Sequence, residues 1–150
     1  MVVTFCGHKE IADCGAVRRW LADVLYELIA EGARTFLLGG YGEFDSLAAL
    51  LLRDLKQRYD AIEVILVLPY LNRNMDSSEY DSTIYPPLER VPKRFAISRR
   101  NQWMVEQADL VVAYVQHSWG GAAKTLEYAE RKKKAVLRYG TAFSYPCEKR

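Results

Sequence analysis

Three short loops combine glycine with side chains that can hold a ligand or move a proton. They are 6–9 (Cys-Gly-His-Lys), 39–45 (Gly-Gly-Tyr-Gly-Glu-Phe-Asp) and 116–121 (Gln-His-Ser-Trp-Gly-Gly). Each follows a strand-like run and precedes a helix-like one. Glycine lets the backbone approach a ligand closely, and the free N–H groups of the following helix attract phosphate. The loops therefore predict a site for an anion or a nucleotide.

The candidate ligand contacts are the loop glycines, the polar and aromatic side chains beside them, and a basic pair further along. They are Gly7, His8, Lys9, Gly39, Gly40, Tyr41, Gly42, Asp45, Arg99, Arg100, Ser118, Trp119, Gly120 and Gly121. Tyr41 and Trp119 could stack on a base, with packing into the core as the alternative. A guanidinium at 99–100 could pair with phosphate, and we expect one of these two arginines to be a plain surface charge.

Two acidic residues are candidate catalytic groups. Asp45 either caps the second helix and compensates its dipole, or binds ribose hydroxyls and assists cleavage of an N-glycosidic bond. Glu43 is placed similarly. Both histidines fall in the loops, and His117 is the weaker candidate for a ligand contact. Two histidines and an unpaired thiol form a poor zinc set, so we expect no metal and no cofactor.

The segments around these loops alternate between two kinds. Apolar β-branched runs predict strands at 2–5, 35–38, 62–68, 110–114 and 135–139. Apolar residues every three or four positions predict helices at 13–31, 44–59, 101–107 and 121–133, with Ser98 as N-cap of the third. This order predicts an α/β fold, a single Rossmann-like doubly wound domain with a mainly parallel five-stranded sheet flanked by helices. In the strand order 3-2-1-4-5 the three loops face one crevice at the carboxyl edge.

One segment interrupts the alternation. Residues 70–95 are polar, lack periodicity and contain three of the five prolines. We interpret them as a long loop or insertion within a single domain that spans 1–150. The segment is either a surface excursion or part of the function.

Composition limits the partners. A formal charge of +2 argues against nucleic acid as a partner, although basic residues cluster at 93–94, 99–100 and 131–134. Three cysteines without a C-x-x-C pair favour a reduced, cytoplasmic protein. No run approaches the ~20 apolar residues of a membrane span, so we expect no membrane contact. The apolar content, half of a short chain, suggests a homo-oligomer.

Four motifs resemble the SLOG superfamily, which includes the Lonely Guy phosphoribohydrolases and the DNA-processing protein of natural transformation. Within it the chain looks most like the YpsA-like branch of small bacterial and phage proteins. Residues 5–9 resemble its strand-T-G-H-R opening, and residues 42–48 its G-x-D-x-x-A turn with one residue more. Residues 99–105 match R-R-N-x-x-M-V, and 120–129 resemble G-G-T-A-x-T-x-x-Y-A.

The resemblance implies a Rossmann-like fold that binds nucleotides or nucleotide-derived ligands. It adds weight to Asp45 and Arg100 and to the 120–121 glycines. It also adds three candidate ligand contacts, which are Asn101, Ala122 and Thr125. The Lonely Guy motif P-G-G-x-G-T-x-x-E is not reproduced, because Ser46 stands where its glutamate would be.

Three functional hypotheses follow. The leading one is a module that senses or sequesters a nucleotide-derived ligand, phosphorylated, ADP-ribose-like or cyclic, at the carboxyl edge of the sheet. The second is a hydrolase or transferase acting at the N-glycosidic bond of a nucleoside monophosphate, related in activity to phosphoribohydrolases or deoxyribosyltransferases. The third, drawn from the basic runs and the remote resemblance to the DNA-processing protein, is binding of single-stranded DNA.

Overall fold

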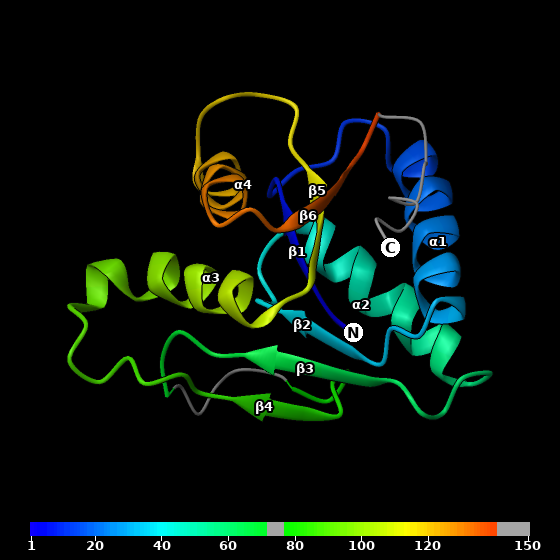
Figure 1. Cartoon of the computed structure of the whole chain (residues 1–150), viewed down its shortest axis with the longest axis horizontal. Coiled ribbons are helices and arrows are strands. Elements are labelled where there is room, and N and C mark those ends of the chain that lie inside the picture. Colours follow the sequence, from blue (N-terminus) through cyan, green and yellow to red (C-terminus); the bar gives the residue numbers. More distant parts are fainter. Residues whose placement is uncertain (72–76, 141–150) are drawn as a thin grey trace.

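A computed structural model describes residues 1–71 and 77–140, and helices and strands alternate along it (Figure 1). In chain order the elements are β1 (Val2–Gly7), α1 (Cys14–Ala30), β2 (Thr35–Leu38), α2 (Glu43–Lys56), β3 (Glu63–Val67), β4 (Ser82–Ile84), the 3-10 turn η1 (Lys93–Phe95), α3 (Ala96–Gln107), β5 (Leu110–Tyr114), α4 (Gly121–Arg131) and β6 (Ala135–Arg138). No helix in these ranges is long and apolar enough to cross a membrane.

The strands form one parallel sheet with the order β4-β3-β2-β1-β5-β6. The predicted α/β, Rossmann-like class and the order of the five predicted strands are confirmed. The sheet has a sixth strand, because β4 adds an edge beside β3 from within 70–95. Within the sheet, that strand count is the difference from the prediction.

Contacts outside the strand itself hold β4 in place. The N–H of Val64 donates to the Asp81 carboxylate at 2.8 Å, and the N–H of Asp81 donates to the Val64 carbonyl at 2.8 Å. Lys56 of α2 pairs with the same carboxylate. A strand of three residues fixed by such distant partners leaves no periodic signal in the sequence.

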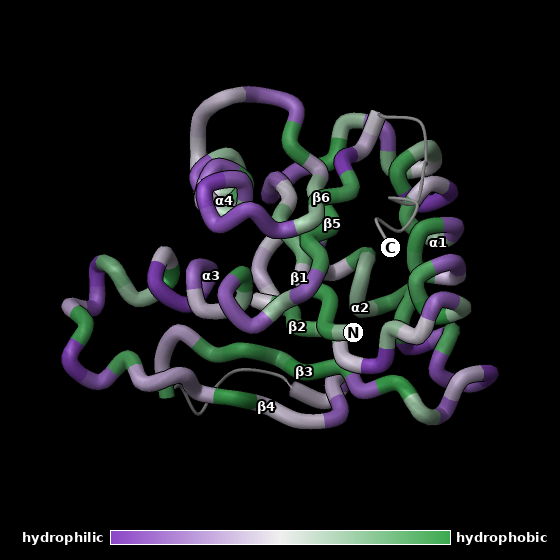
Figure 2. The backbone as a smooth tube through the Cα atoms, viewed as in Figure 1, coloured by the Kyte–Doolittle hydropathy of each residue, from purple (hydrophilic) through white to green (hydrophobic). Residues whose placement is uncertain are grey.

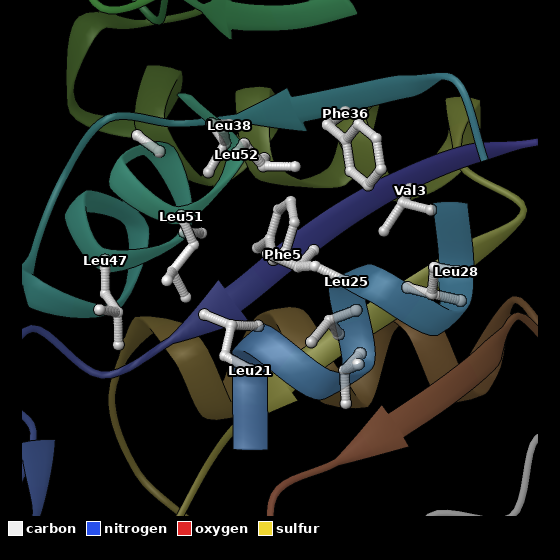
Figure 3. Close-up of a cluster of buried hydrophobic side chains, with 14 of the residues drawn as sticks. Val3, Phe5, Leu21, Leu25, Leu28, Phe36, Leu38, Leu47, Leu51 and Leu52 are labelled. Atoms are coloured by element: carbon white, nitrogen blue, oxygen red, sulfur yellow. The ribbon is translucent and has the colours of Figure 1, made fainter. Parts of the chain in front are cut away.

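One face of the sheet packs against α1 and α2 and forms the larger core. Figure 3 shows Phe5 of β1 among leucine side chains from both helices. Val3, Phe36 and Leu25 belong to the same buried cluster. Side chains of a strand alternate between its faces, so Cys6, next to Phe5, belongs to the opposite cluster with Val111.

The other face is covered by α3 and α4, which pack on each other (Figure 1). The central strands are mostly apolar, whereas the helices alternate between apolar and polar residues (Figure 2). The predicted N-cap of α3 is wrong, since the helix begins at Ala96 and Ser98 lies in its first turn. The turn η1 follows Pro92 and leads directly into the helix. The helix therefore begins five residues before the predicted start at Asn101.

Candidate functional site

A cleft of about 900 Å³ opens at the carboxyl ends of the central strands. The loops β1–α1 and β5–α4 and the first half of α3 supply most of its wall. The predicted contacts that line it are Gly7, His8, Lys9, Tyr41, Asp45, Arg100, Asn101, Trp119, Gly120, Gly121, Ala122 and Thr125. The predicted residues that do not line it are Gly39, Gly40, Gly42, Glu43, Arg99 and Ser118.

The β2–α2 turn is packed against protein rather than open to the cleft. A Cβ on Gly40 would lie 2.6 Å from a methyl carbon of Leu66. Gly42 has φ +94°, and a Cβ there would lie 2.9 Å from the Cα of Lys9. These two glycines are therefore required by close packing and by backbone conformation. From this turn and the start of α2, Tyr41 and Asp45 reach the cleft.

Asp45 holds the turn from inside. Backbone N–H groups of Gly39, Gly40 and Tyr41 donate to its carboxylate. Burial raises the pKa of Asp45 to about 6, against the opposing effects of Arg100 and of those N–H groups. The carboxylate is thus both a structural acceptor and a titratable group at the cleft wall.

Arg100 is a buried partner of the same turn and is 3% exposed. Its Nη1 donates to the carbonyl oxygens of Gly39 at 3.0 Å and Val67 at 2.9 Å, tying the ends of β2 and β3 together. Its Nε donates to the side-chain oxygen of Asn101 at 2.9 Å. Burial lowers the pKa of Arg100, while the charge of Asp45 opposes that shift.

The neighbouring Arg99 is exposed and donates to the side chain of Gln102 at 3.1 Å. It does not line the cleft. The expectation that one arginine of the pair is a surface charge agrees with this position. The phosphate contact proposed for Arg99 therefore has no support from its place in the fold.

Glu43 connects α2 to the β1–α1 loop. Its carboxylate accepts from the N–H of Ile11 at 2.7 Å, and its own N–H donates to the Lys9 carbonyl at 2.8 Å. The side chain lies outside the cleft lining. These bonds explain Glu43 as a residue that fixes the loop, and they offer no geometry for catalysis.

The β1–α1 loop leaves the sheet at Gly7, where a Cβ would lie 2.2 Å from the ring of Phe44. The ammonium of Lys9 lies 5.7 Å from the ring centre of Tyr41, which is 62% exposed. This loop therefore brings a cation and an aromatic ring to the cleft rim.

The β5–α4 loop has a different character from the β2–α2 turn. A Cβ on Gly121 would meet nothing within 4 Å, and one on Gly120 would meet the His117 ring at 3.9 Å. No side chain caps α4, and its first turn contains no acidic residue. The Thr125 hydroxyl donates to the Gly121 carbonyl at 2.9 Å. The first N–H groups of α4 thus have no capping side chain, and the residues of this helix start, Gly120, Gly121 and Ala122, line the cleft.

Three aromatic rings form a stack beside this helix start. The rings of His8 and His117 lie 3.8 Å apart at 16°, and those of His117 and Trp119 lie 3.7 Å apart at 18°. His8 Nε2 accepts from the N–H of Gln116 at 2.7 Å, so the remaining proton of the neutral ring is on Nδ1. Burial, followed by the charge of His117, lowers the pKa of His8.

The stack ends in Trp119, which is 71% exposed. His117, the middle ring, is the residue that the sequence reasoning undervalued. The available signal was the short His-x-Trp spacing at 117–119 within a single glycine-containing loop. His117 Nδ1 is buried and has no hydrogen-bond partner in the described part of the chain.

Other cleft residues were not anticipated. Tyr114, Tyr139 and Ile97 add apolar surface. Cys6 lies in the wall as well, and burial, followed by the charge of Asp45, raises its pKa to about 12. A thiol with that pKa stays protonated at neutral pH and is a poor nucleophile.

No family model and no curated protein sequence matches the chain significantly. Solved structures do. DNA processing protein A from Helicobacter pylori, described for its single-stranded DNA binding mode, superposes with a TM-score of 0.65 at 15% identity over 92% of this chain and 64% of that one. DNA processing protein A (DprA) from Streptococcus pneumoniae gives 0.64 at 17% identity, over 91% of this chain and 49% of that one.

The Moco carrier protein of Chlamydomonas rheinhardtii gives a TM-score of 0.54 at 21% identity, over 94% of this chain and 76% of that one. The expectation that nucleic acid is an unlikely partner is wrong, because a protein with this fold, the Helicobacter one, binds single-stranded DNA. A small net charge is thus no guide here, since binding depends on where charges lie. The chain shares the fold of these proteins, and the similarity extends to the fold alone.

Proposed function

We propose that the cleft binds one nucleotide unit of a single-stranded DNA. The base stacks on Trp119, and its phosphate lies at the start of α4. The observation that carries the proposal is the three-ring stack, which ends in an exposed ring directly before an uncapped helix N-terminus.

The stack supports base binding. His8 and His117 hold Trp119 from behind in nearly parallel planes, so the indole loses little freedom when a base packs on its other face. Stacking of a base on an aromatic side chain contributes about 1–3 kcal/mol and tolerates every base. Such a surface suits a strand of any sequence.

The start of α4 supports phosphate binding. Its free N–H groups and the positive end of its dipole face the cleft. The glycines at 120–121 leave room for a close approach. Lys9 lies in the lining and can add a charge. Glu10, Asp13 and Asp45 also line the cleft, so it favours a singly charged phosphodiester over a polyphosphate.

The DNA itself is suggested by the fold, which is that of DNA processing protein A. This chain spans 64% of the Helicobacter protein and 49% of the Streptococcus protein. Of the properties of the Helicobacter protein, our proposal transfers only the binding of single-stranded DNA to this chain. Membership of the YpsA-like branch is part of the same proposal and rests on the motifs at 99–105 and 120–129.

Fluorescence anisotropy with labelled oligothymidylates tests the proposal. We expect Trp119→Ala to weaken binding roughly 5- to 150-fold, the equivalent of 1–3 kcal/mol. Tyr26→Ala is the matched control, because Tyr26 is an exposed aromatic residue of α1 outside the cleft lining. Equal affinities of wild type and Trp119→Ala for the oligonucleotide would refute base stacking at this position.

A free nucleotide is the second candidate ligand. The cleft volume of about 900 Å³ falls in the range of small-molecule sites. Thermal stabilisation by nucleoside monophosphates, cyclic nucleotides and ADP-ribose distinguishes it from DNA. A ligand at a hundred times its Kd adds about 2.7 kcal/mol, and stabilisation by a nucleotide without binding of oligothymidylate would favour the sensor.

Turnover of such a nucleotide is supported by one observation, the raised pKa of Asp45 in the cleft wall, since perturbed carboxylates cluster at active sites. Incubation with nucleoside monophosphates and detection of free base tests it. Release that is absent in Asp45→Asn and retained in Asp54→Asn, an exposed change on the same helix, would support the enzyme.

A further inference from the structure

A strip of aromatic, apolar and cationic side chains, all exposed except a half-buried tyrosine, leads away from the cleft. It consists of Tyr70, Lys93, Arg94, Phe95 and Ile97, which we call the rim strip. Phe95 is 48% exposed and Ile97 is 45% exposed. Large apolar side chains are costly to leave in water, and here two of them closely follow the cations Lys93 and Arg94 in the chain.

Rings and cations are paired along the strip. The Lys93 ammonium lies 5.6 Å from the ring centre of Tyr70, and the Tyr70 hydroxyl donates to the Lys93 carbonyl at 3.3 Å. The Arg94 guanidinium lies 4.8 Å from the ring centre of Phe95. The cations are therefore held over ring faces, and each unit offers a flat apolar surface next to a positive charge.

The rim strip is continuous with the cleft. Ile97 belongs to both, and Tyr70 is near enough to Arg100 of the cleft wall to influence its pKa. In Figure 1 the chain leaves β4, passes beyond the carboxyl ends of β3 and β4, and returns as α3. A single-stranded DNA with one nucleotide in the cleft thus has a path along η1.

The charge of the strip is uncompensated locally. Neither η1 nor the first turn of α3 contains an acidic residue. Across 1–71 and 77–140, neither Lys93 nor Arg94 forms an ion pair within 4 Å. The positive face suits the phosphates of a strand, and the aromatic rings suit its bases.

A second basic cluster, at the end of α4, provides the contrast. Arg131 and Lys132 each lie 5.5 Å from the ring centre of Tyr128. The Tyr128 hydroxyl, however, bonds to the Glu106 carboxylate, so an acid is built into this cluster. None of its members lines the cleft, which leaves it as a solvated face.

We infer that the rim strip binds the nucleotides that flank the one in the cleft, so that the site takes an extended single strand several nucleotides long. The ring of Phe95 would stack on a base, and Lys93 and Arg94 would pair with the neighbouring phosphates. The inference rests on the proposed binding of single-stranded DNA and goes beyond it by naming a second contact and a site longer than one nucleotide.

Anisotropy with labelled oligothymidylates of three and twelve nucleotides tests the inference. The variants are Lys93→Ala/Arg94→Ala and Phe95→Ala. The matched control is Arg131→Ala/Lys132→Ala, which removes the same charge and the same kind of cation–ring contact. We expect both strip variants to weaken binding of the twelve-mer roughly ten-fold, with the trimer and the control unaffected.

Salt dependence gives a second readout. Each phosphate contact contributes about 0.7 to the slope of log K against log salt for single strands. Lys93→Ala/Arg94→Ala should therefore reduce the slope for the twelve-mer by roughly 1.4. Phe95→Ala should leave the slope as it is, because stacking releases no counterions.

Two outcomes would overturn the inference. In one, the strip variants bind the twelve-mer as wild type does. In the other, the α4 control loses as much affinity as the strip variants, which shows a dependence on total charge. If Trp119→Ala still weakens binding in either case, the proposed function stands without the strip. If the wild-type protein binds no oligonucleotide, both the proposed function and the inference about the rim strip are refuted.

Discussion

Two glycine-containing connections, the β2–α2 turn and the β5–α4 loop, look alike in sequence and differ in space. In the β2–α2 turn, side chains on Gly40 and Gly42 would collide with Leu66 and with the backbone of Lys9. In the β5–α4 loop a side chain on Gly121 would meet nothing within 4 Å. Glycine serves close packing in the first and leaves an open approach in the second.

The helices that follow differ in the same sense. The first turn of α2 contains Glu43 and Asp45, and both are engaged with neighbouring N–H groups. The first turn of α4 has no acidic residue and no capping side chain. An anion is therefore expected at α4 and is disfavoured at α2. The spacing of the glycines in the sequence does not distinguish these two uses, whereas the residues that surround each glycine in the structure do.

Replacing Arg100 should give the largest effect on stability. Arg100→Met leaves two carbonyl oxygens without their donor and the Asp45 carboxylate without the cation that lowers its pKa. We expect the free energy of unfolding to fall by about 3–5 kcal/mol, measured by urea denaturation. Arg99→Met, at an exposed position, should change it by less than about 0.5 kcal/mol. Equal effects would mean that the β2–α2 turn is not clamped.

Gly42→Ala comes next. A side chain at φ +94° is strained by about 1–3 kcal/mol, and the 2.9 Å approach to Lys9 adds to this. We expect a loss of about 2–4 kcal/mol in the free energy of unfolding. A variant as stable as wild type would show that this turn is as open as the β5–α4 loop.

Acid titration probes Asp45, the acceptor inside the β2–α2 turn. Its pKa is about 6 when folded, above the ordinary 3.8, so between these values the folded protein holds a proton that the unfolded chain releases. Its contribution to the free energy of unfolding is present below pH 4 and lost as the pH rises to 6, by about 2–3 kcal/mol. Urea denaturation at several pH values should show this fall in wild type and in Asp54→Asn, and its absence in Asp45→Asn.

Gly121→Ala should have the smallest effect on stability. The position has room for a methyl group, and alanine is a better helix former than glycine, so the free energy of unfolding should stay within about 0.5 kcal/mol. The methyl group would occupy the proposed phosphate position. We expect oligonucleotide binding to weaken roughly ten-fold, or about 1.4 kcal/mol, by anisotropy. Destabilisation comparable to that of Gly42→Ala would remove the contrast between the two connections.

The sequence predicted the elements whose signal is local. The spans of β2 and β5 match the predicted 35–38 and 110–114, because each is a short, mainly apolar run that closely precedes a glycine-containing loop. It did not predict β4, which Asp81 and Lys56 hold through tertiary contacts. The start of α3 was also missed, since the preceding 3-10 turn carries no periodic pattern.

At the candidate site, the three loops were predicted and their roles were not. In sequence, Arg100 resembles an anion-binding arginine, but its main-chain partners are the carbonyl oxygens of Gly39, directly after β2, and Val67, at the end of β3. In the sequence, His117 is a single loop histidine and the weaker candidate for a ligand contact. In the structure it is the middle ring of the stack with His8 and Trp119. Both depend on which segments meet in space, and a single sequence does not contain that information.

The position of β1 in the sheet has a consequence for how the protein is made. This central strand pairs with β2 on one side and, at Val3 and Leu110, with β5 on the other. Chains leave the ribosome at about 5–20 residues per second, so several seconds pass between the emergence of β1 and that of β5. Throughout that interval one edge of an apolar strand has no partner, and such edges recruit other chains. Yield in cells should therefore depend on elongation speed and on chaperones even when the finished protein is stable.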